Sequence, residues 1–318
     1  MGAILRLIRF KNLLVIILTQ VLIKLFLITP YISNPSLSII NFNIYLLALV
    51  TIVSAGYIIN DIYDIEIDKI NRPKTRIISK EIDKESALKA YKILNSIGIT
   101  SGFYVAYQIG KPSFGAIFIF FVFSLWKYSK DYKTSFLIGN LQVALLTALS
   151  IINIALFDLI PLGIKHETGS RIIFYIILIY AAFSFITTLI REIIKDLEDF
   201  DGDKKRNSLT LAISCGIEKT KKISILLILT PILGLAYFQY FQYSVLNSTF
   251  SIEINYWGVN LTAVFYILLL QLLFILLIMK LNTAISKSDF HFSSSLCKII
   301  MLTGILSIPL FHLLYINQ

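Results

Sequence analysis

The chain has 318 residues, of which 57% are hydrophobic and only 15% are charged, and its formal net charge is +10. A soluble domain carries about a quarter charged residues, so this composition excludes an ordinary water-soluble globular protein. The mean hydropathy is +0.78, and the chain contains repeated apolar runs of about 20 residues, the length of a helix that crosses a bilayer.

Nine apolar segments predict membrane-spanning helices. In chain order they cover roughly residues 11–31, 39–59, 91–110, 113–129, 136–157, 171–190, 223–243, 262–280 and 297–316. No Pro-rich or Ser-rich linker separates them. The sequence therefore predicts an all-α integral membrane protein with nine transmembrane helices, in a single domain over residues 1–318.

The basic residues predict the orientation of these helices. If the N-terminus lies inside, all but four of the 29 lysines and arginines fall on the inner side. This asymmetry is what the positive-inside rule expects of a cytoplasmic membrane protein. Topology and anionic lipid headgroups then account for the net charge, and nucleic acid is not needed as a partner. Lys24 is an exception within the first segment, where its side chain can snorkel or face the bundle interior.

Two long polar loops, both expected on the cytoplasmic side, contain a repeat. The first begins "NDIYDIEID" at Asn60, and the second begins "KDLEDFDGD" at Lys195. Three aspartates match at a constant offset of 135 residues, since Asp61, Asp64 and Asp68 correspond to Asp196, Asp199 and Asp203. Each set follows a predicted membrane helix. The match predicts two pseudo-repeat halves that face a shared cavity, as internal repeats do in other membrane proteins.

The spacing of the aspartates indicates a site for a hard cation. Residues three, four and seven apart share one face of a helix, so each set directs three carboxylates to one side. Such carboxylates repel one another unless a cation lies between them, and oxygen ligands suit Mg²⁺ together with substrate phosphates. Arg72 and Lys195 would contact the remaining phosphate oxygens. Asp201 does not lie on the helix face that the three aspartates of the second set share. The plain alternative is that these residues are solvated loop charges.

A diphosphate held by metal at the membrane interface, above an apolar cavity, implies a lipid-tailed diphosphate substrate. Metal ions on the leaving group stabilise the negative charge that develops as an allylic C–O bond breaks. The residues therefore indicate prenyl transfer from a polyprenyl diphosphate donor. The first aspartate motif is then the segment 60–68, and the second is the segment 195–203.

The two motifs, "NDIYDIEIDKINRP" and "REIIKDLEDFDGDKKRNSLTL", resemble the signatures of the UbiA superfamily of membrane prenyltransferases. The resemblance covers the whole chain and implies a bundle of nine helices around a central cavity. It also implies catalytic roles for Asp64, Asp68, Asp199 and Asp203. The implied Mg²⁺ ligands are Asn60, Asp61, Asp64, Asp68, Asp196, Asp199 and Asp203. The implied substrate-binding residues are Arg72, Lys195, Lys130, Lys133 and Asn140. Lys130 and Lys133 are also explained as topology signals.

Within this superfamily the motifs look closest to the branch that alkylates geranylgeranylglyceryl phosphate during ether-lipid synthesis. The open alternative is the branch that prenylates aromatic rings such as 4-hydroxybenzoate or dihydroxynaphthoate for quinones. A cation transporter or a non-catalytic lipid-binding protein is a further alternative. Against transport, the acids gather at one interface, and the centres of the helices are mostly apolar.

Overall fold

The structure is a computed structural model that describes residues 2–71, 76–162, 168–205, 208–241 and 261–316. The chain divides into two compact units. Unit 1 comprises Met1–Ala181 with Asp201–Thr210, and unit 2 comprises Ala182–Phe200 with Leu211–Gln318. The division therefore passes through the second aspartate motif, between Phe200 and Asp201.

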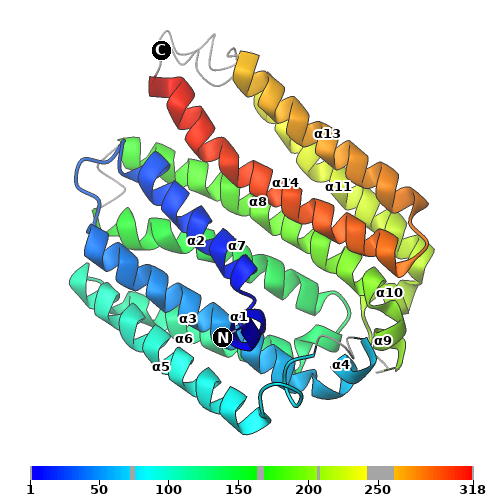
Figure 1. Cartoon of the computed structure of the whole chain (residues 1–318). Helices are drawn as coiled ribbons and strands as arrows, with labels where there is room; N and C mark the ends of the chain where they lie inside the picture. The colour runs from blue at the N-terminus through cyan, green and yellow to red at the C-terminus, as the bar shows by residue number, and fades with distance from the viewer. Residues whose placement is uncertain (1, 72–75, 163–167, 206–207, 242–260, 317–318) are drawn as a thin grey trace. The chain divides into compact units, whose positions relative to one another are not determined.

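Each of the nine expected spans falls largely on a long helix (Figure 1), and residues 242–243 of the span expected at 223–243 lie outside the described residues. These helices are α2 (Phe10–Leu22) with its continuation η1 (Ile23–Ile28), α3 (Ile39–Tyr63), α5 (Lys84–Gln108), α6 (Ala116–Lys130), α7 (Ile138–Asp158), α8 (Thr168–Glu198), α11 (Ile217–Phe241), α13 (Leu261–Thr283) and α14 (Lys287–Ile316). Shorter helices are α1 (Gly2–Leu7), α4 (Ile65–Asn71), α9 (Phe200–Lys205) and α10 (Leu211–Cys215), with single turns η2 (Pro112–Gly115), η3 (Tyr132–Thr134) and η4 (Ile160–Leu162).

Eight helical spans of the described residues are long and apolar enough to cross a membrane. The ninth expected span lies in α5, which is long enough but is interrupted by polar residues such as Asn95 and Thr100, and it is not among the eight. The expected count of nine is therefore approximate.

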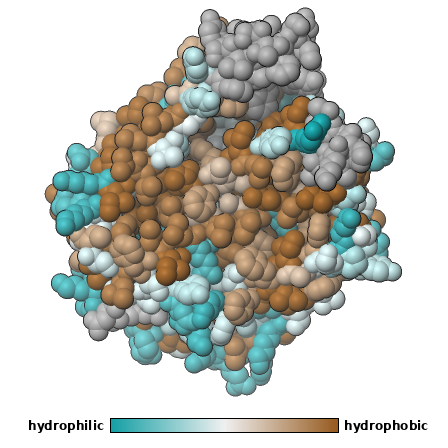
Figure 2. Space-filling model, turned by 180° about the vertical axis from the view of Figure 1, so that it is seen from behind, coloured by the Kyte–Doolittle hydropathy of each residue, from teal (hydrophilic) through white to brown (hydrophobic). Residues whose placement is uncertain are grey.

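The outer surface of the helices is apolar, as a bilayer requires. Leu226, Leu233 and Phe265 are each more than 60% exposed, whereas soluble proteins rarely expose large contiguous apolar patches. Figure 2 shows apolar side chains over much of the face in view. The exposed side chains are therefore lipid-facing, and the protein is an integral membrane protein.

In unit 1, α3 packs against both α5 and α6 (Figure 1). Two glycines of α5 allow close approach, Gly98 to α3 and Gly102 to α6. A Cβ atom at Gly98 would lie 2.5 Å from Ile52 Cγ1, and one at Gly102 would lie 2.2 Å from Phe118 Cδ2. Next to Gly102, the buried ring of Phe118 packs edge-to-face on the buried ring of Phe157. These contacts fix the helix that ends in the first aspartate motif.

The sequence left two interpretations of Lys24, a snorkelling side chain or one that faces the bundle interior. In unit 1 the side chain of Lys24 faces the interior. Its ammonium lies 2.6 Å from Asp158 Oδ2 and donates to the carbonyl oxygen of Leu37 at 2.8 Å. Asp158 Oδ1 in turn accepts a hydrogen bond from Leu37 N at 2.8 Å. Lys24 lies in η1, a π-helical turn closed by a bond from Thr29 N to Lys24 O. A snorkelling lysine is thereby excluded.

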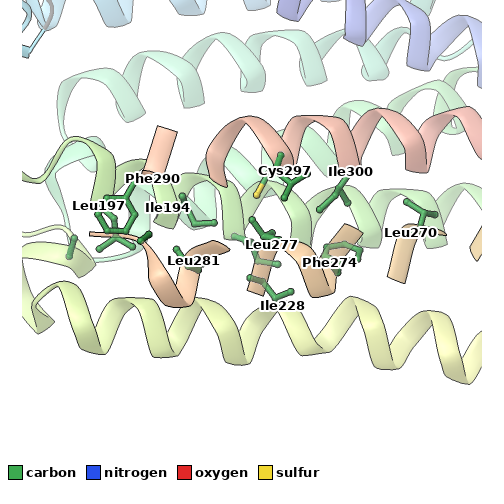
Figure 3. Close-up of a cluster of buried hydrophobic side chains, with 14 residues drawn as sticks. Ile194, Leu197, Ile228, Leu270, Phe274, Leu277, Leu281, Phe290, Cys297 and Ile300 are labelled. Atoms are coloured by element: carbon green, nitrogen blue, oxygen red, sulfur yellow. The ribbon is translucent and has the colours of Figure 1, made fainter. Parts of the chain in front are cut away.

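In unit 2, one buried apolar cluster joins α8, α11, α13 and α14 (Figure 3). The close-up shows Leu197 of α8 beside Phe290 of α14, with Ile194 close by. Farther along the helices, Leu277 and Phe274 of α13 lie near Ile228 of α11. This cluster holds the end of α8, and with it the start of the second aspartate motif, against the first turn of α14.

Candidate active site at the aspartate motifs

The first motif lies where α3 meets α4. Helix α3 ends at Tyr63, Asp64 is its C-cap with φ −92° and ψ 5°, and α4 begins at Ile65. Asp64 is buried, and its Oδ2 accepts a hydrogen bond from Asn60 Nδ2 at 3.0 Å. Asp68 continues the path on α4, where its backbone N donates to Asp64 O at 2.8 Å. The helix is thus interrupted at the middle aspartate.

Lys133 is brought to this motif from the connection between α6 and α7. Its ammonium forms an ion pair with Asp64 and lies 3.3 Å from Asn60 Oδ1. The connection runs close to the start of α7, because a Cβ atom at Gly139 would lie only 2.6 Å from the carbonyl oxygen of Tyr132. The structure therefore places one of the expected substrate-binding lysines directly on the most buried aspartate of the motif.

Arg9 is a second cation at this motif, and the sequence did not indicate it. Its Nη2 lies 3.0 Å from Asp61 Oδ1, and its guanidinium lies 4.8 Å from the centre of the Tyr57 ring. Burial disfavours the charged guanidinium, but its charge interaction and hydrogen bond with Asp61, together with the phenol group of Tyr57, outweigh burial and raise the pKa of Arg9. Its φ is 52°, a left-handed conformation that is rare for residues other than glycine and often marks functional sites.

The other expected substrate-binding residues of this half are Lys130, Asn140 and Arg72. Lys130 has an exposed side chain whose Nζ lies 5.0 Å from the centre of the Trp126 ring. Asn140 is buried near the start of α7. Arg72 lies outside the described residues.

The second motif repeats the interruption of the first. Helix α8 ends at Glu198, α9 begins at Phe200, and Asp199 N donates to Lys195 O at 2.9 Å. The corresponding bond in the first motif runs from Asp64 N to Asn60 O, at 3.0 Å. Donor and acceptor are each displaced by 135 residues. The expected stripe of three aspartates on one continuous helix is therefore wrong for both motifs, because each helix ends at its middle aspartate.

Charged neighbours surround the second motif within unit 2. Glu192 is buried, with Arg191 Nη1 2.5 Å from its Oε1 and Lys195 Nζ 3.9 Å from its Oε2. Asp196 is half-buried. From α14, Lys287 and His291 approach Asp199 and Glu198, and both residues are additions to the set that the sequence suggested. Asp203 belongs to unit 1, where it is half-buried, and Asp201 is exposed.

The donor atoms of both motifs suit a hard divalent cation, since they are carboxylate and amide oxygens. In the part of the chain that the structure describes, no three acidic, His or Cys side chains lie close enough together to hold a metal ion. At Asp64 a positive charge is already supplied by Lys133. The residues therefore fit Mg²⁺ by the chemistry of their donor atoms, and the cation that the structure places on the buried carboxylate of Asp64 is the Lys133 ammonium.

Fold and motifs together define a polytopic, all-helical membrane protein with aspartate motifs at two helix ends. A family model described as the UbiA prenyltransferase family matches residues 21–296. The chain belongs to this family, as the motifs suggested.

Curated relatives of the chain share one description. A digeranylgeranylglyceryl phosphate synthase of Sulfurisphaera tokodaii is 38% identical over 183 residues, which cover 56% of this chain and 60% of the relative. One of Methanosphaera stadtmanae is 34% identical over 209 residues, 64% of this chain and 70% of the relative. The matched part thus spans about 60% of the length of the Sulfurisphaera relative.

Two solved structures resemble the whole chain. One, described as "Structural and mechanistic insights into the biosynthesis of Digeranylgeranylglyceryl phosphate synthase in membranes", has a TM-score of 0.64 at 24% identity and covers 98% of both chains. An apo structure of a UbiA homolog from Aeropyrum pernix K1 has a TM-score of 0.63 at 14% identity, covering 93% of this chain and 97% of that one. At these identities the likeness concerns the fold, and it confirms the expected UbiA-like helical fold.

Proposed function

We propose that this chain transfers a geranylgeranyl group from its diphosphate to geranylgeranylglyceryl phosphate, a reaction of ether-lipid synthesis. The observation that carries the proposal is the pair of aspartate motifs with the same interruption in a member of the UbiA prenyltransferase family. The acceptor is supported by the curated relatives, which are described as digeranylgeranylglyceryl phosphate synthases.

In this reaction the allylic C–O bond of the donor breaks and diphosphate leaves. The acceptor hydroxyl forms a new ether bond to that carbon and gives up its proton. Bound Mg²⁺ supplies positive charge that stabilises the departing diphosphate. Its proposed ligands are Asn60, Asp61, Asp64, Asp68, Asp196, Asp199 and Asp203.

The chain's own cations bind and orient the phosphate groups. Lys133 and Arg9 already lie on the first motif, and Lys195 lies in the second. Guanidinium and ammonium groups form charge-assisted hydrogen bonds to phosphate oxygens, about twice as strong as neutral ones. We assign Arg72, Lys130 and Asn140 to the same role from the family resemblance. Both motifs are proposed to lie on the cytoplasmic side, where the basic residues gather.

The proposal is tested with purified protein in detergent, Mg²⁺ and labelled geranylgeranyl diphosphate. Geranylgeranylglyceryl phosphate is offered as one acceptor, and 4-hydroxybenzoate or dihydroxynaphthoate as others. A labelled diether phosphate is the expected product. A prenylated ring instead would move the protein to quinone synthesis, and transfer to none of the acceptors would refute the proposed acceptor.

The site assignment has its own test. Asp64→Asn and Asp199→Asn are each expected to lower Mg²⁺-dependent turnover by orders of magnitude, while the matched variant Asp201→Asn keeps most of it. Asp201 is exposed and lies two residues from Asp199, so it controls for a general change of charge in this segment. Thermal unfolding of all three variants shows whether the fold is kept. Full turnover in the first two variants would overturn the assignment.

A further inference from the structure

Unit 2 places two side chains of α14 beside the second aspartate motif. Lys287, the first residue of α14, has its Nζ 3.9 Å from Asp199 Oδ1. One turn later, His291 Nδ1 lies 2.9 Å from Glu198 Oε1. The positive-inside rule accounts for a lysine on this side of the membrane. It does not account for a lysine that faces the middle aspartate of a motif.

The first turn of α14 is held in this place by apolar packing and capping. Phe290 lies between Lys287 and His291 in the sequence and is buried, as is Leu197 of the motif helix (Figure 3). Asp289 caps the same turn, because its Oδ2 accepts hydrogen bonds from Ser286 N at 2.8 Å and Ile285 N at 3.1 Å. The backbone position of Lys287 therefore does not depend on its ion pair.

The same arrangement occurs in unit 1. Asp64 and Asp199 are equivalent in the repeat, and each interrupts its helix. Asp64 pairs with Lys133, which follows two further long helices, α5 and α6. Asp199 lies near Lys287, which also follows two further long helices, α11 and α13. Lys287 is thus the topological counterpart of Lys133 in the second half of the chain.

The ion pair itself adds little to stability. The side chain of Lys287 is 56% exposed and that of Asp199 24% exposed, and pairs at such sites contribute little. A lysine is, however, a compact point charge that binds phosphate well. We infer that Lys287 binds a phosphate oxygen of a substrate beside Asp199. This inference rests on the proposed function.

The phosphate belongs either to the diphosphate of the donor or to the phosphate of the acceptor lipid, and kinetics distinguish the two. The test uses the full chain in detergent with Lys287→Met, Lys287→Arg and the matched control Lys222→Met, an exposed lysine of the same unit. The KM of each substrate is measured with the other saturating. Binding of inorganic diphosphate with Mg²⁺ is measured by calorimetry, and thermal unfolding monitors the fold.

We expect Lys287→Met to raise one KM by roughly ten- to a hundred-fold, the value of one charge-assisted hydrogen bond. Lys287→Arg restores most of the affinity, and Lys222→Met changes neither KM. If the donor KM rises and diphosphate binding weakens, the phosphate that Lys287 binds is that of the donor. A rise in the acceptor KM alone assigns the acceptor phosphate.

Two results separate this inference from the proposed function. If the wild-type chain forms no ether product but Lys287→Met still weakens diphosphate binding relative to Lys222→Met, the inference holds and the proposed function fails. If the wild type is active and Lys287→Met leaves both KM values and diphosphate binding unchanged, the inference is overturned and the proposed function stands. In an inactive protein, equal binding of both inorganic diphosphate and geranylgeranylglyceryl phosphate by all variants also overturns the inference.

Discussion

The buried pair of Lys24 and Asp158 makes a quantitative prediction about stability. The two side chains are 5% and 0% exposed, and together they satisfy both backbone polar groups of Leu37. In Lys24→Met the carboxylate of Asp158 stays buried without its counter-ion. Removal of one partner of a buried pair costs about 3–5 kcal/mol. At roughly 2 °C per kcal/mol, this corresponds to a fall in Tm of roughly 6–10 °C.

The double variant Lys24→Met/Asp158→Asn removes the stranded charge. An amide oxygen at position 158 still accepts the hydrogen bond from Leu37 N, but the carbonyl oxygen of Leu37 keeps no donor. An unsatisfied buried carbonyl costs about 1–3 kcal/mol, less than the uncompensated charge. We therefore expect the free energy of unfolding of the double variant to exceed that of Lys24→Met by about 2 kcal/mol, and its Tm to be higher by roughly 4 °C.

The assay is thermal unfolding in detergent, followed by tryptophan fluorescence. Lys89→Met is the matched control, since Lys89 is paired with Glu85 but is 71% exposed, and its Tm is expected to change by about 1 °C or less. If Lys24→Met melts within 1–2 °C of the wild type, or if the double variant is no more stable than Lys24→Met, the reasoning is refuted.

Three further predictions concern the site and its supports. Gly139→Ala would place a Cβ atom 2.6 Å from the backbone oxygen of Tyr132, so the connection that carries Lys133 must move. We expect kcat/KM to fall roughly ten- to a hundred-fold, while the helical circular dichroism stays unchanged. Arg9→Met should raise the donor KM, whereas Lys11→Met, a change at a nearby exposed lysine, should leave it unchanged; an unchanged donor KM in Arg9→Met would exclude Arg9 from phosphate binding. Hydrogen bonds from Ser86 lower the pKa of Asp83, the N-cap of α5. The stabilisation by this cap is therefore complete above the ordinary pKa of Asp83 and is lost as the pH falls through the lowered value, so the Tm difference between wild type and Asp83→Ala should vanish in acid.

The membrane helices could be predicted because the signal is local. An apolar run of about 20 residues identifies a span wherever it occurs. The same signal does not show where a helix continues beyond its apolar part into polar residues. The span expected at 297–316 is the apolar part of a helix that begins at Lys287, and that expected at 171–190 belongs to a helix that extends to Glu198. Both aspartate motifs and the first turn of α14 lie in such polar extensions, where hydropathy carries no information.

The residues around the motifs were only partly predictable, because their contacts are not local. Lys24 and Asp158 are separated by 134 positions, and Arg9 and Asp61 by 52. No spacing rule relates such residues. In addition, the positive-inside rule offered a sufficient reason for Arg9 and Lys287, so neither stood out among the other basic residues. Lys133 was included only through the family resemblance.

The interruption at the middle aspartate explains why the residues of the motifs were identified while their geometry was not. A spacing of three and seven residues has a fixed meaning only on an unbroken helix. The residues that flank the break differ between the halves, since Tyr63 and Ile65 correspond to Glu198 and Phe200. What both halves share is the aspartate itself and its backbone bond to the residue four positions earlier. Asp64 adopts the bridge conformation in which many active-site residues are found. In both halves the break falls at the middle aspartate, and it places the last carboxylate of each motif on a separate helical segment.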